Sequence, residues 1–462
     1  MFQPPVAPPA LPRATLRTLL ALAWPVVLAR SSQSVVSLSD ALMVAPLGES
    51  ALAATTTGAM NTLAFIILPM GTVFIVQSFA AQLFGRGDLT AARRYAWYGL
   101  ILAAVAMVLS VVASPLVGPV LKLFRFSPEV HDLQTKYIAV RMWSLGAVVG
   151  TEALGNWFAG LGNTRIQMRA SLVTMASNVL LNWVFIYGKL GAPALGVTGA
   201  ALANTIASWL GFAVVAFVFA RHDRTSGVRG PLALRVSELV RMVRFGLPNG
   251  INWFMEFGAF LLFINAIVAP LGTLPLAAMN VIMTINSVSF MPAFGLSSAG
   301  AILVGQAIGR GLKDQVSSIV WRTARVAMTW QGTVGLAYFL LPGPLLMAFA
   351  PHGDAGALVR VGAGMLALSG LWQLFDAVGL AFGEALRAAG DTTWCMWARL
   401  VLGWLVFVPV AYVVVTVRGG GPIGAVASIV FYIVCLAAML VLRFRSGAWR
   451  RIQLTEPELS VV

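Results

Sequence analysis

Apolar residues follow one another along this chain in long stretches, separated by short segments rich in charge, glycine and proline. A helix needs about 20 apolar residues to cross the hydrocarbon core of a bilayer. The pattern therefore predicts an all-α integral membrane protein with twelve transmembrane helices. The predicted spans are residues 16–45, 52–83, 95–121, 133–160, 168–188 and 196–220 in the first half, and 239–268, 274–308, 321–350, 356–388, 395–417 and 422–444 in the second.

The composition agrees with this pattern. Hydrophobic residues make up 59% of the 462 residues, charged residues make up only 10%, and the mean hydropathy is +0.86. A soluble protein of this length needs far more charge to cover its surface. No small-residue cleavage site marks the first apolar stretch as a signal peptide, so we expect the first span to be retained.

The net charge of +15 indicates a membrane topology and no nucleic-acid partner. Basic residues stand at the ends of apolar segments, and no basic run interleaves with aromatic residues. Most of the 31 Lys and Arg residues share one side of the membrane when both termini are placed in the cytoplasm. This distribution follows the positive-inside rule, so we expect both termini to be cytoplasmic.

The two halves of the chain repeat each other. "PLGESALAA" at 46–54 recurs as "PLGTLPLAA" at 270–278, and "AQLFGRG" at 81–87 recurs as "GQAIGRG" at 305–311. Both pairs lie 224 residues apart. Because six spans is an even number, both halves enter the membrane from the same side. Two such bundles facing a central cavity are typical of a transporter.

The repeat predicts the domain limits. We expect residues 1–220 to form one six-helix bundle and residues 239–444 to form a second, pseudo-symmetric bundle. The basic segment 221–238 is predicted to be a cytoplasmic linker, and residues 445–462 a cytoplasmic tail.

Acidic residues interrupt several of the predicted spans. Five fall inside them: Asp40, Glu152, Glu256, Asp376 and Glu384. A charge at the bilayer centre costs roughly 2.5 kcal/mol or more even on lenient insertion scales, so such residues usually face a cavity, pair with a cation or carry a proton. Glu384 lies three residues before Arg387, and an ion pair on one helix explains it. Glu152 is interpreted as structural or as facing the cytoplasm.

Arg30 is the one arginine that we place within the membrane from the sequence. It stands ten residues before Asp40, about 15 Å along a helix, which is too far for a direct pair. Asp40, Glu256 and Asp376 are therefore expected to lack a basic partner and to line a wet interior.

Polar residues extend these carboxylates along single helix faces. Gln33 and Ser37 precede Asp40 by seven and three residues, and Asn252 precedes Glu256 by four. These spacings place each set on one face of a helix. A face of this kind is expected to line the cavity.

Two further polar rows lie in other spans. Asn178 and Asn182 stand one turn apart in the fifth span, and Asn280, Thr284 and Ser287 share a face of the eighth. These rows either line the cavity or hydrogen-bond one helix to another, as Asn, Ser and Thr side chains often do in membranes.

Aromatic and methionine side chains can supply an adaptable apolar wall with cation–π capacity. The alternative for each of them is ordinary helix packing. The candidates are Trp157, Trp253, Phe257, Met279, Met283 and Trp372.

Several segments together resemble the multidrug and toxic compound extrusion (MATE) transporters, in order and spacing from about residue 16 to 444. They are "VVSLSDALMVAPLGESALAA", "AQLFGRGD", "GLGNTR", "NVLLNWVFIYGKLGAPALGVTGAALA" and "LFDAVGLAFGEALRAAGDT". The resemblance implies two six-helix bundles, alternating access, and export of organic cations in exchange for Na⁺ or H⁺, with no cofactor.

The resemblance also implies site residues. The NorM-like branch carries an acid in the first span, a glutamate in the seventh and an aspartate in the tenth, which correspond here to Asp40, Glu256 and Asp376. Asn182 stands where another branch carries an aspartate. The chain departs from the family in Met279-Asn280, where "HQ" is common, and in Trp372, where some relatives have tyrosine.

The coupling ion is expected to be Na⁺ or H⁺. Na⁺ requires several oxygen ligands, which Glu256 and Asp376 can provide together with an amide oxygen of Asn252 or Asn280. A proton needs only one carboxylate, and Asp40 can supply it. The Glu256–Asp376 combination favours Na⁺.

Two other classes of function are considered. A flippase for lipid-linked precursors needs a cationic cavity, which a single arginine does not provide. A membrane enzyme needs clustered metal-binding carboxylates or a large catalytic loop, and neither is present in the sequence. We therefore expect a multidrug antiporter in the bacterial inner membrane that is monomeric and whose partners are small organic cations and the bilayer.

Overall fold

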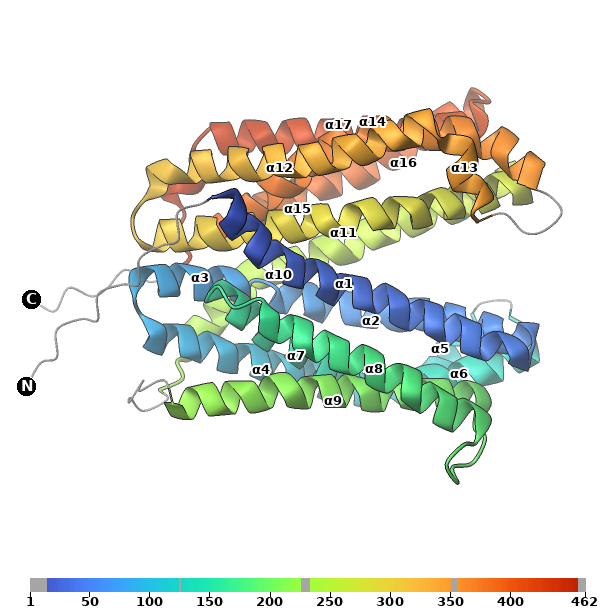
Figure 1. Ribbon diagram of the computed structural model, residues 1–462, viewed down its shortest axis with the longest axis horizontal. Helices are drawn as coiled ribbons and strands as arrows, with labels where there is room; N and C mark the ends of the chain where they lie inside the picture. The colour runs from blue at the N-terminus through green and yellow to red at the C-terminus, as the bar shows by residue number, and fades with distance from the viewer. Residues whose placement is uncertain (1–14, 124–125, 226–232, 350–354, 456–462) are drawn as a thin grey trace, which may run out of the picture. The chain divides into compact units, whose positions relative to one another are not determined.

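The computed structural model describes residues 15–123, 126–225, 233–349 and 355–455. Nearly all of these residues are helical (Figure 1). Within the described ranges, ten helical segments are long and apolar enough to cross a membrane.

The predicted fourth and ninth spans are not among those ten. Residues 133–160 are divided between α6 (Pro128–Met142) and α7 (Leu145–Gly160), which have 15 and 16 residues. Each is too short by itself to cross the hydrocarbon core. The ninth span falls in α12 (Lys313–Leu340), where Arg322 and Arg325 lower the hydropathy of a 28-residue helix.

The chain divides into two compact units. Pro25–Gly250 belong to the first, and Ile251–Val462 belong to the second together with residues 15–24. The chain passes between the units inside two long helices, α1 (Leu16–Val44) and α10 (Val236–Leu262).

The remaining helices of the first unit end at recognisable local signals. They are α2 (Glu49–Val73), α3 (Val76–Arg86), α4 (Leu89–Ala113), α5 (Val117–Leu121), α6, α7, α8 (Arg165–Tyr187) and α9 (Gly196–Thr225). Gly87 ends α3 with φ of 87°, a left-handed conformation that glycine adopts without strain. The Asp88 carboxylate then accepts a hydrogen bond of 2.8 Å from the Ala91 amide and caps α4.

Close helix contacts in the first unit depend on small residues. The α8 and α9 helices run side by side (Figure 1). A Cβ atom added to Gly71 of α2 would lie 2.8 Å from the Gly250 Cα of α10. The Asn249 side chain donates a 2.7 Å hydrogen bond to the Gly71 carbonyl at the same contact. Glycine is required there because no side chain fits between the two backbones.

The second unit is built around one long helix. Its elements are α11 (Thr273–Gly309), α12, α13 (Pro342–Met347), α14 (Ala355–Ala389), α15 (Thr392–Leu400), α16 (Val408–Tyr412) and α17 (Gly421–Arg445), with π-helical turns at Phe263–Val268, Val401–Phe407 and Val413–Val417. The α14 helix packs against α11, α12 and α17, and Phe382 is fully buried among them.

Helices extend into the predicted linker 221–238 from both sides. The α9 helix continues to Thr225 and α10 begins at Val236. Residues 226–232 of this linker and 456–462 of the predicted tail lie outside the described residues.

Candidate ion and substrate site

Asp40 of the first unit lies in a cage of amide side chains. It is 8% exposed. Asn182 of α8 donates a 2.6 Å hydrogen bond to Asp40 Oδ1, and Asn204 of α9 donates a 2.7 Å bond to Oδ2. The Asn182 amide also contacts Asn178 Oδ1 at 3.1 Å. Three helices therefore meet at one carboxylate, and both of its oxygens accept charge-assisted bonds.

The structure brings the predicted Asn178 and Asn182 to Asp40, and it adds Asn204, which we did not predict. The signal for Asn204 in the sequence is a single amide inside the apolar stretch "GAALANTIA". Asn182 Oδ1 is buried and has no hydrogen-bond partner among the described residues. An oxygen without a donor beside a carboxylate suits a bound cation.

The first-span row does not join this cage. Gln33 and Ser37 are exposed, whereas Asp40 is buried. The Ser37 hydroxyl donates a 3.2 Å hydrogen bond to the Gln33 carbonyl of its own helix.

Glu152 forms an ion pair with Arg30. Asn156 and Gln167 donate further hydrogen bonds of 3.1 and 3.3 Å to its two oxygens. Arg30 and Glu152 thus compensate each other's charge within the first unit, which agrees with the structural interpretation of Glu152.

Glu256 of the second unit is paired with an arginine that we did not place within the membrane. Arg399 of α15 lies 3.0 Å from Glu256 through Nη1 and Oε2, and Tyr432 contacts Oε1 at 3.4 Å. Arg399 belongs to the candidate span Thr392–Val417. The expectation that Arg30 is the only intramembrane arginine is therefore wrong, and so is the expectation that Glu256 lacks a basic partner. Residue spacing on one helix cannot show a partner on another.

Asp376 of α14 accepts a 2.9 Å hydrogen bond from Gln331 of α12. It also interacts electrostatically with Glu256 and Arg399, so the two predicted carboxylates are brought near each other. Gln331 Oε1 is buried without a hydrogen-bond partner among the described residues, as is Asn252 Oδ1 one turn before Glu256. Gln331 is a further polar residue that sequence reasoning missed.

The α11 helix buries a different polar face from the one predicted for the eighth span. Asn280 and Thr284 are exposed, and the Thr284 hydroxyl donates to the Asn280 carbonyl at 2.9 Å. The buried network uses Asn286 and Ser289 instead. Ser289 donates a 2.9 Å bond to Gln373 Oε1, and Gln373 donates to Asn286 Oδ1.

The residues predicted to form an apolar wall differ in how deeply they are buried. Trp372 is buried in the core of the second unit, and Met283 packs against the same core. Trp253 is half-buried on α10, one residue after Asn252.

Glu384 pairs with Arg387 as predicted. The Arg387 side chain is only 4% exposed, so the pair is more buried than an interfacial position implies.

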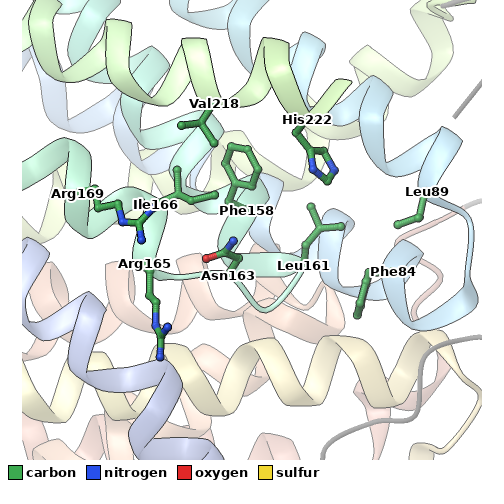
Figure 2. A pocket seen from close by; sticks show the side chains of 10 residues that line it. All are labelled: Phe84, Leu89, Phe158, Leu161, Asn163, Arg165, Ile166, Arg169, Val218 and His222. Carbon is green, nitrogen blue, oxygen red and sulfur yellow. The ribbon is translucent and has the colours of Figure 1, made fainter. Parts of the chain in front are cut away.

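A pocket of about 740 Å³ opens elsewhere in the first unit (Figure 2). Its polar lining comes from Asn163, Arg165, Arg169 and His222, and Phe158 belongs to its apolar wall. None of the predicted cavity residues lines this pocket, and its cationic lining does not suit a cationic substrate.

Across the described ranges, no group of three or more His, Cys, Asp and Glu side chains forms a metal site.

Comparison with known proteins decides the family. The MatE family model matches residues 25–184 and 248–413. The chain belongs to the MatE family. The two matched segments begin at Pro25 and Pro248, which lie 223 residues apart and so agree within one residue with the 224-residue offset of the internal repeat.

Curated relatives cover most of the chain. A probable multidrug resistance protein NorM from Thermotoga maritima is 28% identical over 80% of this chain and 79% of its own length. The multidrug resistance protein MdtK of Yersinia enterocolitica is 27% identical over 93% of this chain and 95% of its own.

Solved MATE structures share the fold. A crystal structure of MATE in complex with MaL6 aligns with a TM-score of 0.86 at 20% identity and covers 94% of this chain and 97% of its own. The eukaryotic MATE transporter AtDTX14 aligns with a TM-score of 0.84 at 18% identity over 94% and 96%.

Proposed function

We propose that this protein is a secondary multidrug antiporter, which exports organic cations in exchange for Na⁺ or H⁺. The names of the NorM and MdtK relatives support the multidrug assignment. The observation that carries the exchange mechanism is the Asp40 cage, because a buried carboxylate held by two amide donors is a site for a cation or a proton.

The second unit supplies the other part of the mechanism. Glu256 and Asp376, with the amide oxygens of Asn252 and Gln331 nearby, are the proposed Na⁺ ligands of this half. A bound ion neutralises these carboxylates and weakens their attraction for a cationic drug. The drug then leaves, and the re-ionised carboxylates attract the next one after the ion dissociates. Such mutual exclusion is the requirement for exchange.

The proposed architecture is that of the family. Twelve spans form two pseudo-symmetric six-helix bundles, with α6–α7 and α12 as the fourth and ninth spans. Both termini lie in the cytoplasm of a bacterial inner-membrane protein that works as a monomer by alternating access. The repeat of Pro25 and Pro248 inside α1 and α10 supports this arrangement.

Reconstituted liposomes with ethidium as the cationic probe test the proposal. We expect a Na⁺ gradient, imposed at equal pH on both sides, to drive countertransport of ethidium, and Glu256→Gln to abolish the response. Asp314→Asn is the control, because this carboxylate is 93% exposed. A response to a pH gradient alone would assign H⁺ as the coupling ion. Transport that neither gradient accelerates would refute antiport.

The alternative is an exporter of a lipid-linked or other metabolite with H⁺ coupling. Arg399 adds an intramembrane cation, but its pairing with Glu256 leaves no net positive charge for a phosphate group. The liposome assay distinguishes the two functions, because a flippase leaves ethidium transport at the background rate.

A further inference from the structure

A permanent cation lies inside the second unit, at one of the proposed ion-binding carboxylates. Arg399 contacts Glu256 at 3.0 Å, and a Cβ atom added to Gly383 of α14 would lie 3.2 Å from the other terminal nitrogen of Arg399. The guanidinium therefore fits between α10 and α14. Arginine does not lose its proton in proteins, so its charge stays in place under all physiological conditions.

The carboxylates around Arg399 outnumber the cation. Glu256 and Asp376 contribute two carboxylates, and Arg399 contributes one guanidinium. Arg399 is hydrogen-bonded to Glu256, whereas Asp376 accepts from the neutral Gln331 amide. In the ion-free protein Arg399 thus compensates Glu256 before Asp376.

The pair is accessible rather than sealed. The Glu256 side chain is 40% exposed and the Arg399 side chain 19% exposed. An incoming cation can therefore reach the exposed side of Glu256 before the guanidinium separates from the carboxylate. A partly exposed pair also opens more readily than a fully buried one, in which separation strands an uncompensated charge.

We propose that Arg399 is a tethered counter-cation, which competes with the coupling ion for the Glu256 carboxylate. This inference rests on the proposed function and adds a residue that tunes ion affinity. Ion binding at Glu256 requires Arg399 to move away, and the return of Arg399 favours ion release. Glu256 is then compensated in both the loaded and the ion-free protein, and the affinity for the ion is lower than two free carboxylates would give.

Sodium binding to the purified full-length protein tests this competition. Isothermal titration at fixed pH, with NaCl as the titrant and choline chloride holding ionic strength, gives the half-saturating Na⁺ concentration. We expect Arg399→Gln to lower it at least tenfold, or to make binding measurable where the unchanged protein shows none. Arg443→Gln is the matched control, because Arg443 pairs with Asp391 in the same unit and is 25% exposed. We expect a change of less than twofold there.

Two further variants keep the test decisive. In a Glu256→Gln background, Arg399→Gln is expected to change the half-saturating concentration by less than twofold, since the competition has lost its target. If Arg399→Gln does not fold, Arg399→Lys replaces it. A strongly hydrated ammonium pairs less well at this half-buried position, and a two- to fivefold decrease is expected.

An Arg399 variant whose half-saturating concentration is unchanged or higher overturns the inference, as does the absence of Na⁺ binding in both the unchanged protein and the folded Arg399→Gln variant. Because binding is measured without transport, these results stand apart from a failure of ethidium exchange, which would refute only the antiport proposal.

Discussion

Replacing Asp40 by asparagine is expected to lower both the stability of the protein and its rate of transport. The size of the loss in stability can be worked out from the hydrogen bonds of the amide cage. Each carboxylate oxygen accepts one hydrogen bond, from Asn182 at 2.6 Å and from Asn204 at 2.7 Å. An asparagine offers one oxygen and one amino group. The amide of either Asn182 or Asn204 then meets this amino group, so two hydrogen-bond donors face each other without an acceptor.

The expected cost follows from these two bonds. A buried donor without an acceptor costs about 1–3 kcal/mol, and the surviving bond weakens from about 1.5–3 kcal/mol to the 0.5–1.5 kcal/mol of a neutral pair. Asp40→Asn should therefore destabilise the first unit by about 2–4 kcal/mol in total. Loss of the charge should also lower ethidium exchange at least tenfold.

Thermal unfolding in detergent and liposome transport separate the two effects. Combining Asp40→Asn with Asn204→Asp restores one carboxylate and one amide to the same contact, and moves the charge from α1 to α9. We expect this double variant to recover at least half of the lost stability but not transport. The reasoning is refuted if Asp40→Asn unfolds and transports like the unchanged protein, or if the double variant is no more stable than the single one.

Four other predictions can be tested separately. Asp376→Asn should reduce ethidium exchange at least tenfold while the exposed Asp314→Asn changes it less than twofold; equal rates in liposomes would remove Asp376 from the site. Gly250→Ala should lower the unfolding temperature because its Cβ would overlap the α2 backbone, at a cost of about 1–3 kcal/mol. Gly379→Ala, with nothing within 4 Å of its Cβ, should instead stabilise α14 by about 0.5–1 kcal/mol, and the opposite order in a thermal scan would contradict the packing argument. Arg224→Cys, in a background without the two native cysteines, should resist an impermeant maleimide in intact cells; efficient labelling from outside would reverse the topology.

The amino-acid sequence by itself predicts what depends on neighbours along one helix. Apolar runs of sufficient length predict helices in a membrane, because every backbone polar group must be satisfied within the segment. Glu384 and Arg387 pair because three residues place them on one face, and Asn178 and Asn182 meet for the same reason. The repeat and the resemblance to the MATE family likewise came from the order of short motifs.

The tertiary structure decided which faces meet, because the partner of a buried charge lies on a different helix. Asn204 reaches Asp40 from 164 residues away, and Arg399 reaches Glu256 from 143 residues away. Helical periodicity defines the direction of each side chain around its own axis, but not which neighbour that direction points to. That choice results from close packing of small residues and from the cost of leaving a charge unpaired, and both act only when the helices are assembled.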